Sequence, residues 1–70
     1  MNLTKAVEGK EYIITNINTQ DGELKSFLFS LGCYSGEKIS VISNLKSSLI
    51  VAIKDSKYNI DMNLAQVVEI

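Results

Sequence analysis

The sequence predicts a mainly β domain in which five short strands close into a small barrel, with one short helix after the first strand. Three observations predict this fold class. Short apolar segments with period-two alternation recur along the 70 residues, as is typical of strands. One segment instead carries its apolar residues at helical spacing. A tight hairpin and a single helical turn precede the last segment.

The first predicted strand covers residues 10–18. Tyr12 and Ile14 share one face of this strand, but Ile17 is out of phase with them. Because strand side chains alternate between two faces, Ile17 joins the same core only if the strand bends or bulges in the two residues before it. The lead-in before this strand supplies two expected core residues and one turn residue: Leu3, Val7 and Gly9.

The predicted helix covers residues 22–31. Asp21 is its expected N-cap, because its carboxylate can accept a free amide proton of the first turn, and Glu23 adds favourable negative charge there. Gly32 is expected to end the helix in a left-handed turn. The apolar residues recur at i, i+3, i+4 and i+7 and are expected to line one face: Leu24, Phe27, Leu28 and Leu31.

The second and third predicted strands flank a polar loop. Gly36 is the turn into the second strand, residues 37–43, and the loop at 44–48 carries Leu45 at its tip. The third strand covers residues 49–54. Its inward residues alternate, as expected for a strand with one buried face: Leu49, Val51 and Ile53.

The end of the chain predicts a hairpin and a closing strand. Residues 55–57 are the expected hairpin connection, and residues 58–61 form the fourth strand. Asn63 is expected to cap one helical turn before a fifth strand at 67–70. The inward residues of the fourth strand and its extension are expected to be Tyr58, Ile60 and Met62.

This order of elements predicts a five-stranded SH3-like barrel, formed by a single domain that covers residues 1–70. Closure of the barrel explains how so short a chain avoids long unpaired strand edges. An OB-fold is the alternative, since it also has five strands. Its helix lies between strands three and four, whereas here the helix follows strand one.

Composition disfavours several classes of function. The net charge is −1, and all seven basic residues are Lys, which argues against a nucleic-acid or anionic-membrane surface. The chain has no His, so Cys33 has no imidazole partner to activate its thiolate. No nucleotide-binding glycine motif is present. We therefore expect a protein that is not an enzyme and has neither a cofactor nor a metal site of its own.

The number of cysteines and the length of the apolar runs indicate the cellular compartment in which we expect the protein. Cys33 is the single cysteine, which excludes a disulfide within the chain and fits a reducing compartment. The longest apolar run, residues 49–53, has five residues, whereas a membrane-spanning helix needs about 20. The first residues have no apolar stretch of signal-peptide length. We expect a cytoplasmic protein without direct membrane insertion.

One spacing of apolar residues and glycines runs through the helix and the second strand. It reads L-x-x-L-G-x-x-x-G-x-x-I-x-V-I and consists of Leu28, Leu31, Gly32, Gly36, Ile39, Val41 and Ile42. This spacing resembles the FeoA family of ferrous iron transport accessory proteins. The resemblance extends to both ends of the chain, through Leu3, Gly9, Tyr12, Ile14, Ile17, residues 49–53, Tyr58, Ile60, Ala65, Val67, Val68 and Ile70.

The resemblance implies a small cytosolic SH3-like protein that assists ferrous iron uptake. Its implied partner is the cytosolic region of a FeoB-type membrane transporter. Family members often carry Arg in the helix and near the fourth strand, where this chain has Lys25, Ser26 and Tyr58, so an Arg-mediated contact is not carried over. Cys33 and Tyr34 also depart from the small or aliphatic residues usual after the L-G pair.

Candidate partner-binding residues follow from the helical wheel and from the loops. Phe29 lies outside the apolar face and beside Lys25, so it is either an anchor for a partner or covered by a loop of the same domain. Tyr34 and Leu45 lie in connections, where binding residues are frequent. The alternative functions are a regulatory SH3-like domain associated with a metal-dependent transcriptional repressor, and an RNA-binding module, which the charge disfavours. Formation of a homo-oligomer stays open.

Overall fold

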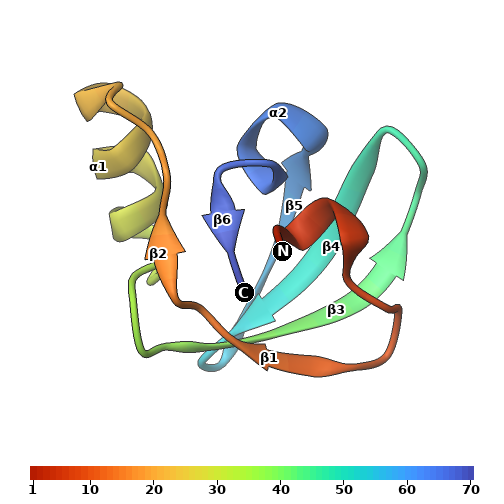
Figure 1. The fold of residues 1–70 in the computed structure, drawn as a ribbon. Helices are drawn as coiled ribbons and strands as arrows, with labels where there is room; N and C mark the ends of the chain where they lie inside the picture. The colour runs from red at the N-terminus through yellow and green to blue at the C-terminus, as the bar shows by residue number, and fades with distance from the viewer.

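Two antiparallel sheets form the body of the molecule, and the computed structural model describes all residues from 1 to 70 (Figure 1). The larger sheet has the strand order β1-β3-β4-β5, and the smaller sheet pairs β2 with β6. The strands are β1 (Glu11–Ile13), β2 (Asn16–Ile17), β3 (Lys38–Asn44), β4 (Ser48–Ile53), β5 (Ser56–Asp61) and β6 (Val68–Glu69).

Three short helices complete the fold. A 3₁₀ helix, η1 (Leu3–Lys5), precedes β1; α1 (Gly22–Ser30) connects β2 to β3; and α2 (Met62–Ala65) connects β5 to β6. In Figure 1, α1 lies at one side of the molecule and the β3–β4 hairpin at the other. The mainly β class is therefore confirmed, with α1 after the first strand segments and one helical turn before the last strand.

The number of strands differs from the prediction, because the first predicted strand is two strands. The break falls at Ile14 and Thr15, where the chain changes sheets. The Ile14 amide donates to the Glu37 carbonyl at 2.9 Å, and the next amide, of Thr15, donates to the Glu69 carbonyl at 2.8 Å. This bend lets both Ile14 and Ile17 reach the core, so the expected irregularity before Ile17 is confirmed.

The core consists of fourteen buried residues, all apolar. The predicted inward residues of β4, namely Leu49, Val51 and Ile53, are fully or almost fully buried. Val7 was predicted to join them, but it is 61% exposed, and Ala6 is buried instead. The 3₁₀ turn of η1 explains this correction, since residues three apart eclipse and Ala6 therefore shares a face with Leu3.

The start of α1 is set by the predicted N-cap. Asp21 accepts hydrogen bonds from the amides of Glu23 at 3.0 Å and Leu24 at 3.2 Å. These bonds satisfy two of the amides that a helix leaves without partners at its first turn. Asp21 is therefore confirmed as the residue at which the chain enters α1.

The end of α1 is a Schellman motif around Gly32. The Cys33 amide donates to the Leu28 carbonyl, and the Gly32 amide donates to the Phe29 carbonyl, each at 2.9 Å. Gly32 has φ of +95°, and a Cβ atom placed on it would lie 3.0 Å from Cγ2 of Ile53. Glycine is required here both by the backbone conformation and by the close approach of β4.

The two remaining turns are shifted from their predicted positions. The β4–β5 turn consists of Lys54 and Asp55, with Lys54 at φ of +57°, so β5 starts at Ser56 instead of residue 58. The N-cap of α2 is Asp61 and not Asn63, because Met62 is already helical and Asp61 Oδ1 accepts from the Leu64 amide at 2.9 Å.

Replacing Gly32 by Ala is expected to destabilise the fold by about 1–3 kcal/mol, since a side chain there is strained by the positive φ and crowds Ile53. Gly22→Ala is the matched control. Gly22 lies in the first turn of α1, and a Cβ atom placed on it would meet no heavy atom within 4 Å, so the same change is expected to be neutral or stabilising by up to about 1 kcal/mol. Urea unfolding of both variants measures the difference, and equal effects would contradict this assignment.

Burial raises the pKa of the Cys33 thiol from 9.0 to about 11. An unfolded chain loses this proton at lower pH than the folded chain does, so stability conferred by the buried neutral thiol is present below pH 9 and declines between pH 9 and 11. The free energy of unfolding is expected to fall by about 2–3 kcal/mol from this group over that interval. Comparing the pH dependence of urea unfolding with that of Cys33→Ala isolates the effect, because Lys and Tyr titration is common to both proteins. Parallel curves would contradict it.

Candidate interaction surface

The way α1 packs against the hydrophobic core decides which side chains of the helix remain accessible. Leu28 is fully buried and faces the core. Its chain neighbours Phe27 and Phe29 lie about 100° to either side of it on the helix, and they are 49% and 48% exposed. Phe27, which was predicted to line one apolar face together with Leu28, is therefore not buried with it. Leu28, at one edge of the predicted apolar face, is thus the fully buried residue of α1, Leu24 and Leu31 are half-buried, and Phe27 at the other edge is exposed.

Phe29 has one aromatic neighbour, which comes from the segment after α1. The rings of Phe29 and Tyr34 meet edge to face, with centroids 6.3 Å apart and planes at 88°. Tyr34 itself is 37% exposed. Phe29 was expected to be either an anchor for a partner or covered by a loop of the same domain. The loop covers it only in part, because Tyr34 contacts one side of the ring and about half of the Phe29 side chain stays exposed.

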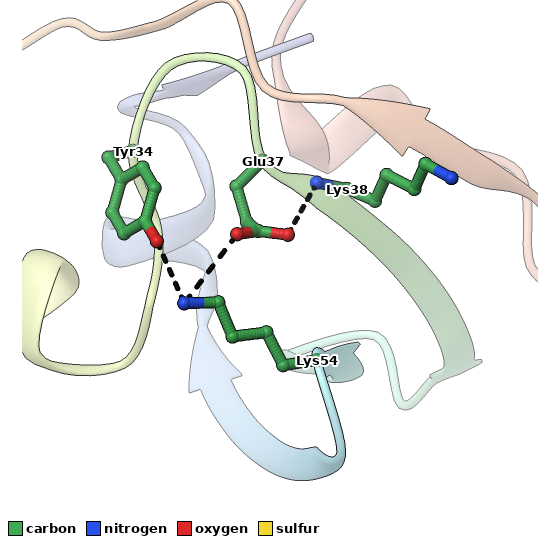
Figure 2. A network of polar contacts seen from close by, with 4 residues as sticks. All are labelled: Tyr34, Glu37, Lys38 and Lys54. Atoms are coloured by element: carbon green, nitrogen blue, oxygen red, sulfur yellow. Dashed lines mark hydrogen bonds and ion pairs between the residues drawn. The ribbon is translucent and has the colours of Figure 1, made fainter.

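A polar network holds Tyr34 in place (Figure 2). Lys54 Nζ donates to Tyr34 Oη at 2.8 Å and lies 3.7 Å from Glu37 Oε1. Glu37 Oε2 in turn accepts from the Lys38 backbone amide at 3.0 Å. The side chain of Lys54 thereby links the β4–β5 turn to the segment between α1 and β3.

The contact between Lys54 and Tyr34 is a hydrogen bond to the hydroxyl and not a stack on the ring face. The ammonium lies 5.3 Å from the ring centroid but only 2.8 Å from Oη, so it lies beyond the hydroxyl and not above the ring. This hydrogen bond is the main cause that raises the pKa of Lys54 above its usual value, with Glu37 adding to it. The ammonium therefore remains charged at neutral pH.

We define the aromatic surface as Phe29, Tyr34 and Lys54. Lys25, which was predicted to neighbour Phe29, is exposed and lies one helical turn before it, so it borders this surface on α1. Leu45 is 50% exposed, but it lies at the tip of the β3–β4 hairpin, on the opposite side of the molecule from α1 (Figure 1). The structure therefore brings together three of the four predicted contact residues and separates Leu45 from them.

Sequence reasoning missed Lys54 and Glu37 as members of this region. Lys54 reaches Tyr34 only through the tertiary fold, since it is twenty residues away in the chain, and the side chain of Glu37 joins the network through Lys54. Lys54 occupies a left-handed turn position, φ +57°, which ordinarily signals Gly, Asn or Asp. No local sequence pattern marks a lysine as the residue that takes this conformation.

Three further properties of the molecule bear on its chemistry. No three His, Cys, Asp or Glu side chains come together as a group that could hold a metal ion. The surface contains no pocket. Neither α-helix combines the length and the apolar character that crossing a membrane requires.

Solved structures with the same fold include two kinds of protein. One is a crystal structure of the iron uptake regulatory protein FeoA, with 24% identity and a TM-score of 0.86 over 94% of this chain and 88% of that chain. Another is Stenotrophomonas maltophilia FeoA complexed with zinc, a prokaryotic SH3 domain protein suggested to activate bacterial ferrous iron transport. It has 15% identity and a TM-score of 0.86, over 97% of this chain and 86% of that chain.

A manganese-dependent transcriptional repressor contains the same fold as part of a longer protein. It has 19% identity and a TM-score of 0.84, over 100% of this chain and 41% of that chain. At these identities the likeness concerns the fold, which is SH3-like. A comparison with curated proteins found no match.

The family comparison covers the whole chain, since the FeoA domain matches residues 1–70. This agrees with the L-G-x-x-x-G spacing between α1 and β3, where Gly32 and Gly36 both adopt positive φ. The chain belongs to the FeoA domain family.

Proposed function

We propose that this chain is a non-enzymatic accessory protein of ferrous iron uptake, which acts in the cytoplasm by direct contact with the cytosolic region of a FeoB-type transporter. Membership of the FeoA domain family over residues 1–70 supports a role in ferrous iron transport. The observation that carries the contact is the exposed, edge-to-face pair of Phe29 and Tyr34 at the end of α1.

The aromatic surface has the properties of a binding anchor. Aromatic side chains tend to dominate interface energies, because they bury large areas at a small cost in conformational entropy. Tyr34 is held by its hydrogen bond to Lys54 and by the ring of Phe29, so little further ordering is needed on binding. Lys25 and Lys54 are exposed beside the rings and favour a partner whose apolar groove has an acidic rim.

A second candidate function follows from the manganese-dependent repressor, in which the fold occurs as one part of a longer chain. In that case the domain would act on a DNA-binding chain rather than on a transporter. Purification of the tagged protein from its native cells distinguishes the two, because the first function predicts recovery of the transporter and the second recovery of a DNA-binding protein.

Phe29→Ala is expected to weaken binding to the purified cytosolic region of the transporter at least tenfold, since truncating an aromatic anchor commonly costs about 2 kcal/mol. Its effect on thermal stability is expected to be small, because the ring is half exposed. Leu45→Ala is the matched control, with similar exposure on the opposite side of the molecule. Titration calorimetry measures both affinities. Equal affinities of the two variants, or a large loss of stability in Phe29→Ala, would argue against the proposed contact.

Tyr34→Phe and Tyr34→Ala separate the ring from the hydroxyl. The Phe variant loses the hydrogen bond with Lys54 but retains a ring against Phe29, so we expect a loss of binding of a few-fold. The Ala variant removes both and is expected to approach the effect of Phe29→Ala. The same calorimetric titration tests this order, and a Tyr34→Ala variant that binds like the unsubstituted protein would place the contact elsewhere.

A further inference from the structure

The open edge of β5 (Ser56–Asp61) is a backbone surface that the proposed function does not use. β5 is the last strand of the larger sheet and has a strand neighbour, β4, on one side only. The hairpin closes on the pair Ile53↔Ser56. Because residues of an antiparallel strand alternate in the direction of their backbone groups, those directed at β4 are Ser56, Tyr58 and Ile60.

The alternate residues of β5 direct their backbone groups away from the sheet. These residues, Lys57, Asn59 and Asp61, are all exposed. Their backbone amides and carbonyls make none of the hydrogen bonds found in the turns and loops. The amides of these three residues and the carbonyls of Lys57 and Asn59 face no neighbouring strand, and such a row is a template for pairing with another strand. The carbonyl of Asp61 is engaged by α2, because Asp61 is the N-cap of that helix. At the other end of the sheet β1 offers a shorter edge, because it has three residues and β5 has six.

The sequence of this edge is complementary to itself. When β5 pairs antiparallel with a second copy about Asn59, Lys57 lies opposite Asp61 of that copy, on the outer face of both sheets. On the other face, Tyr58 lies opposite Ile60. The pairing of Lys57 with Asp61 is favourable between cross-strand neighbours, whereas Ile60 is already buried in its own core and adds little to the contact. A strand edge with like charges in these positions would repel its own copy.

Both charged groups retain capacity for this contact. One oxygen of Asp61, Oδ1, accepts from the Leu64 amide, which leaves Oδ2 for an ammonium group. The intrachain ion pair of this molecule joins Lys54 to Glu37, so Lys57 has no carboxylate partner within its own chain. The charge complementarity is therefore available to a second copy of this chain.

We propose that two copies of this protein form a symmetric dimer by antiparallel pairing of their β5 edges about Asn59. The two Asn59 residues exchange backbone hydrogen bonds in both directions, and each Asp61 amide donates to the Lys57 carbonyl of the other copy. The charge pairs fix this register, because shifting the strands by two residues removes Lys57 from Asp61. The inference is independent of the proposed function, since the aromatic surface on α1 and Tyr34 does not include β5.

Sedimentation equilibrium over micromolar to millimolar concentrations tests the dimer. Asn59→Pro removes an amide that faces away from β4, so it is expected to weaken association at least tenfold while the β4–β5 ladder survives. Lys57→Glu places a negative charge opposite Asp61 of the other copy and is also expected to weaken association at least tenfold. Lys38→Glu, with the same charge change on the inner strand β3, is the control and is expected to dimerise normally. An unsubstituted protein that stays monomeric, or a dimer that tolerates both β5 variants, overturns the proposal.

Single cysteines test the register. The two Asn59 Cα atoms lie opposite each other in the proposed pair, at about 5.5 Å, which a disulfide can span. Asn59→Cys is therefore expected to form a disulfide-linked dimer under mild oxidation. Lys57→Cys is the control, because its mate lies about 13 Å away, four residues along the strand. Cys33 is buried and is common to both variants. Absence of the link at 59, or equally rapid linking at 57, contradicts this register.

Discussion

The packing of Leu28 in the core is the interaction on which the arrangement of the aromatic surface depends. Leu28 is the fully buried residue of α1, and its carbonyl also accepts the Cys33 amide that closes the helix. The same residue thus anchors the helix and fixes the point at which the chain leaves it. Because Cys33 is buried as well, the following residue, Tyr34, is delivered to the surface beside Phe29.

Gly32 allows the end of α1 to pack against the larger sheet. Its lack of a side chain lets the end of α1 approach Ile53 of β4, and β4 leads directly into the turn that carries Lys54. Lys54, which holds Tyr34, therefore directly follows β4, the strand against which α1 ends. Core packing, helix termination and the placement of the exposed aromatic pair follow from one set of contacts, which explains how 70 residues present an ordered aromatic surface.

Local features were predictable from the sequence, whereas features set by tertiary contact were not. Asp21 and Gly32 were identified correctly because caps depend on the chemistry of single residues next to the helix. The burial of alternate residues in β4 was also correct, because both neighbouring strands and the core constrain its register. Phe27 was misassigned since periodicity shows which residues share a face but not how much of that face the barrel covers.

The remaining differences have the same origin. Val7 was expected in the core, but the 3₁₀ turn of η1 places Ala6 there, and no sequence signal distinguishes that turn from an extended lead-in. Asn63 is a good capping residue, yet Asp61 caps α2 because β5 ends at Asp61 and the next residue, Met62, is already helical. In the candidate surface, the position of Phe29 outside the apolar face was predictable from the helical wheel, whereas its exposure was left open. The bond between Tyr34 and Lys54 was not predictable, because only the folded chain brings these residues together.

On the proposed function, the aromatic surface is the part of this protein that meets the transporter. The most direct test is an NMR titration of the isotope-labelled chain with the unlabelled cytosolic region of a FeoB-type transporter. We expect the largest changes in amide and side-chain signals at Phe29, Tyr34 and Lys54, while the tip of the β3–β4 hairpin around Leu45 is unchanged. Changes centred on that hairpin, or saturating concentrations of transporter without any change, would contradict it.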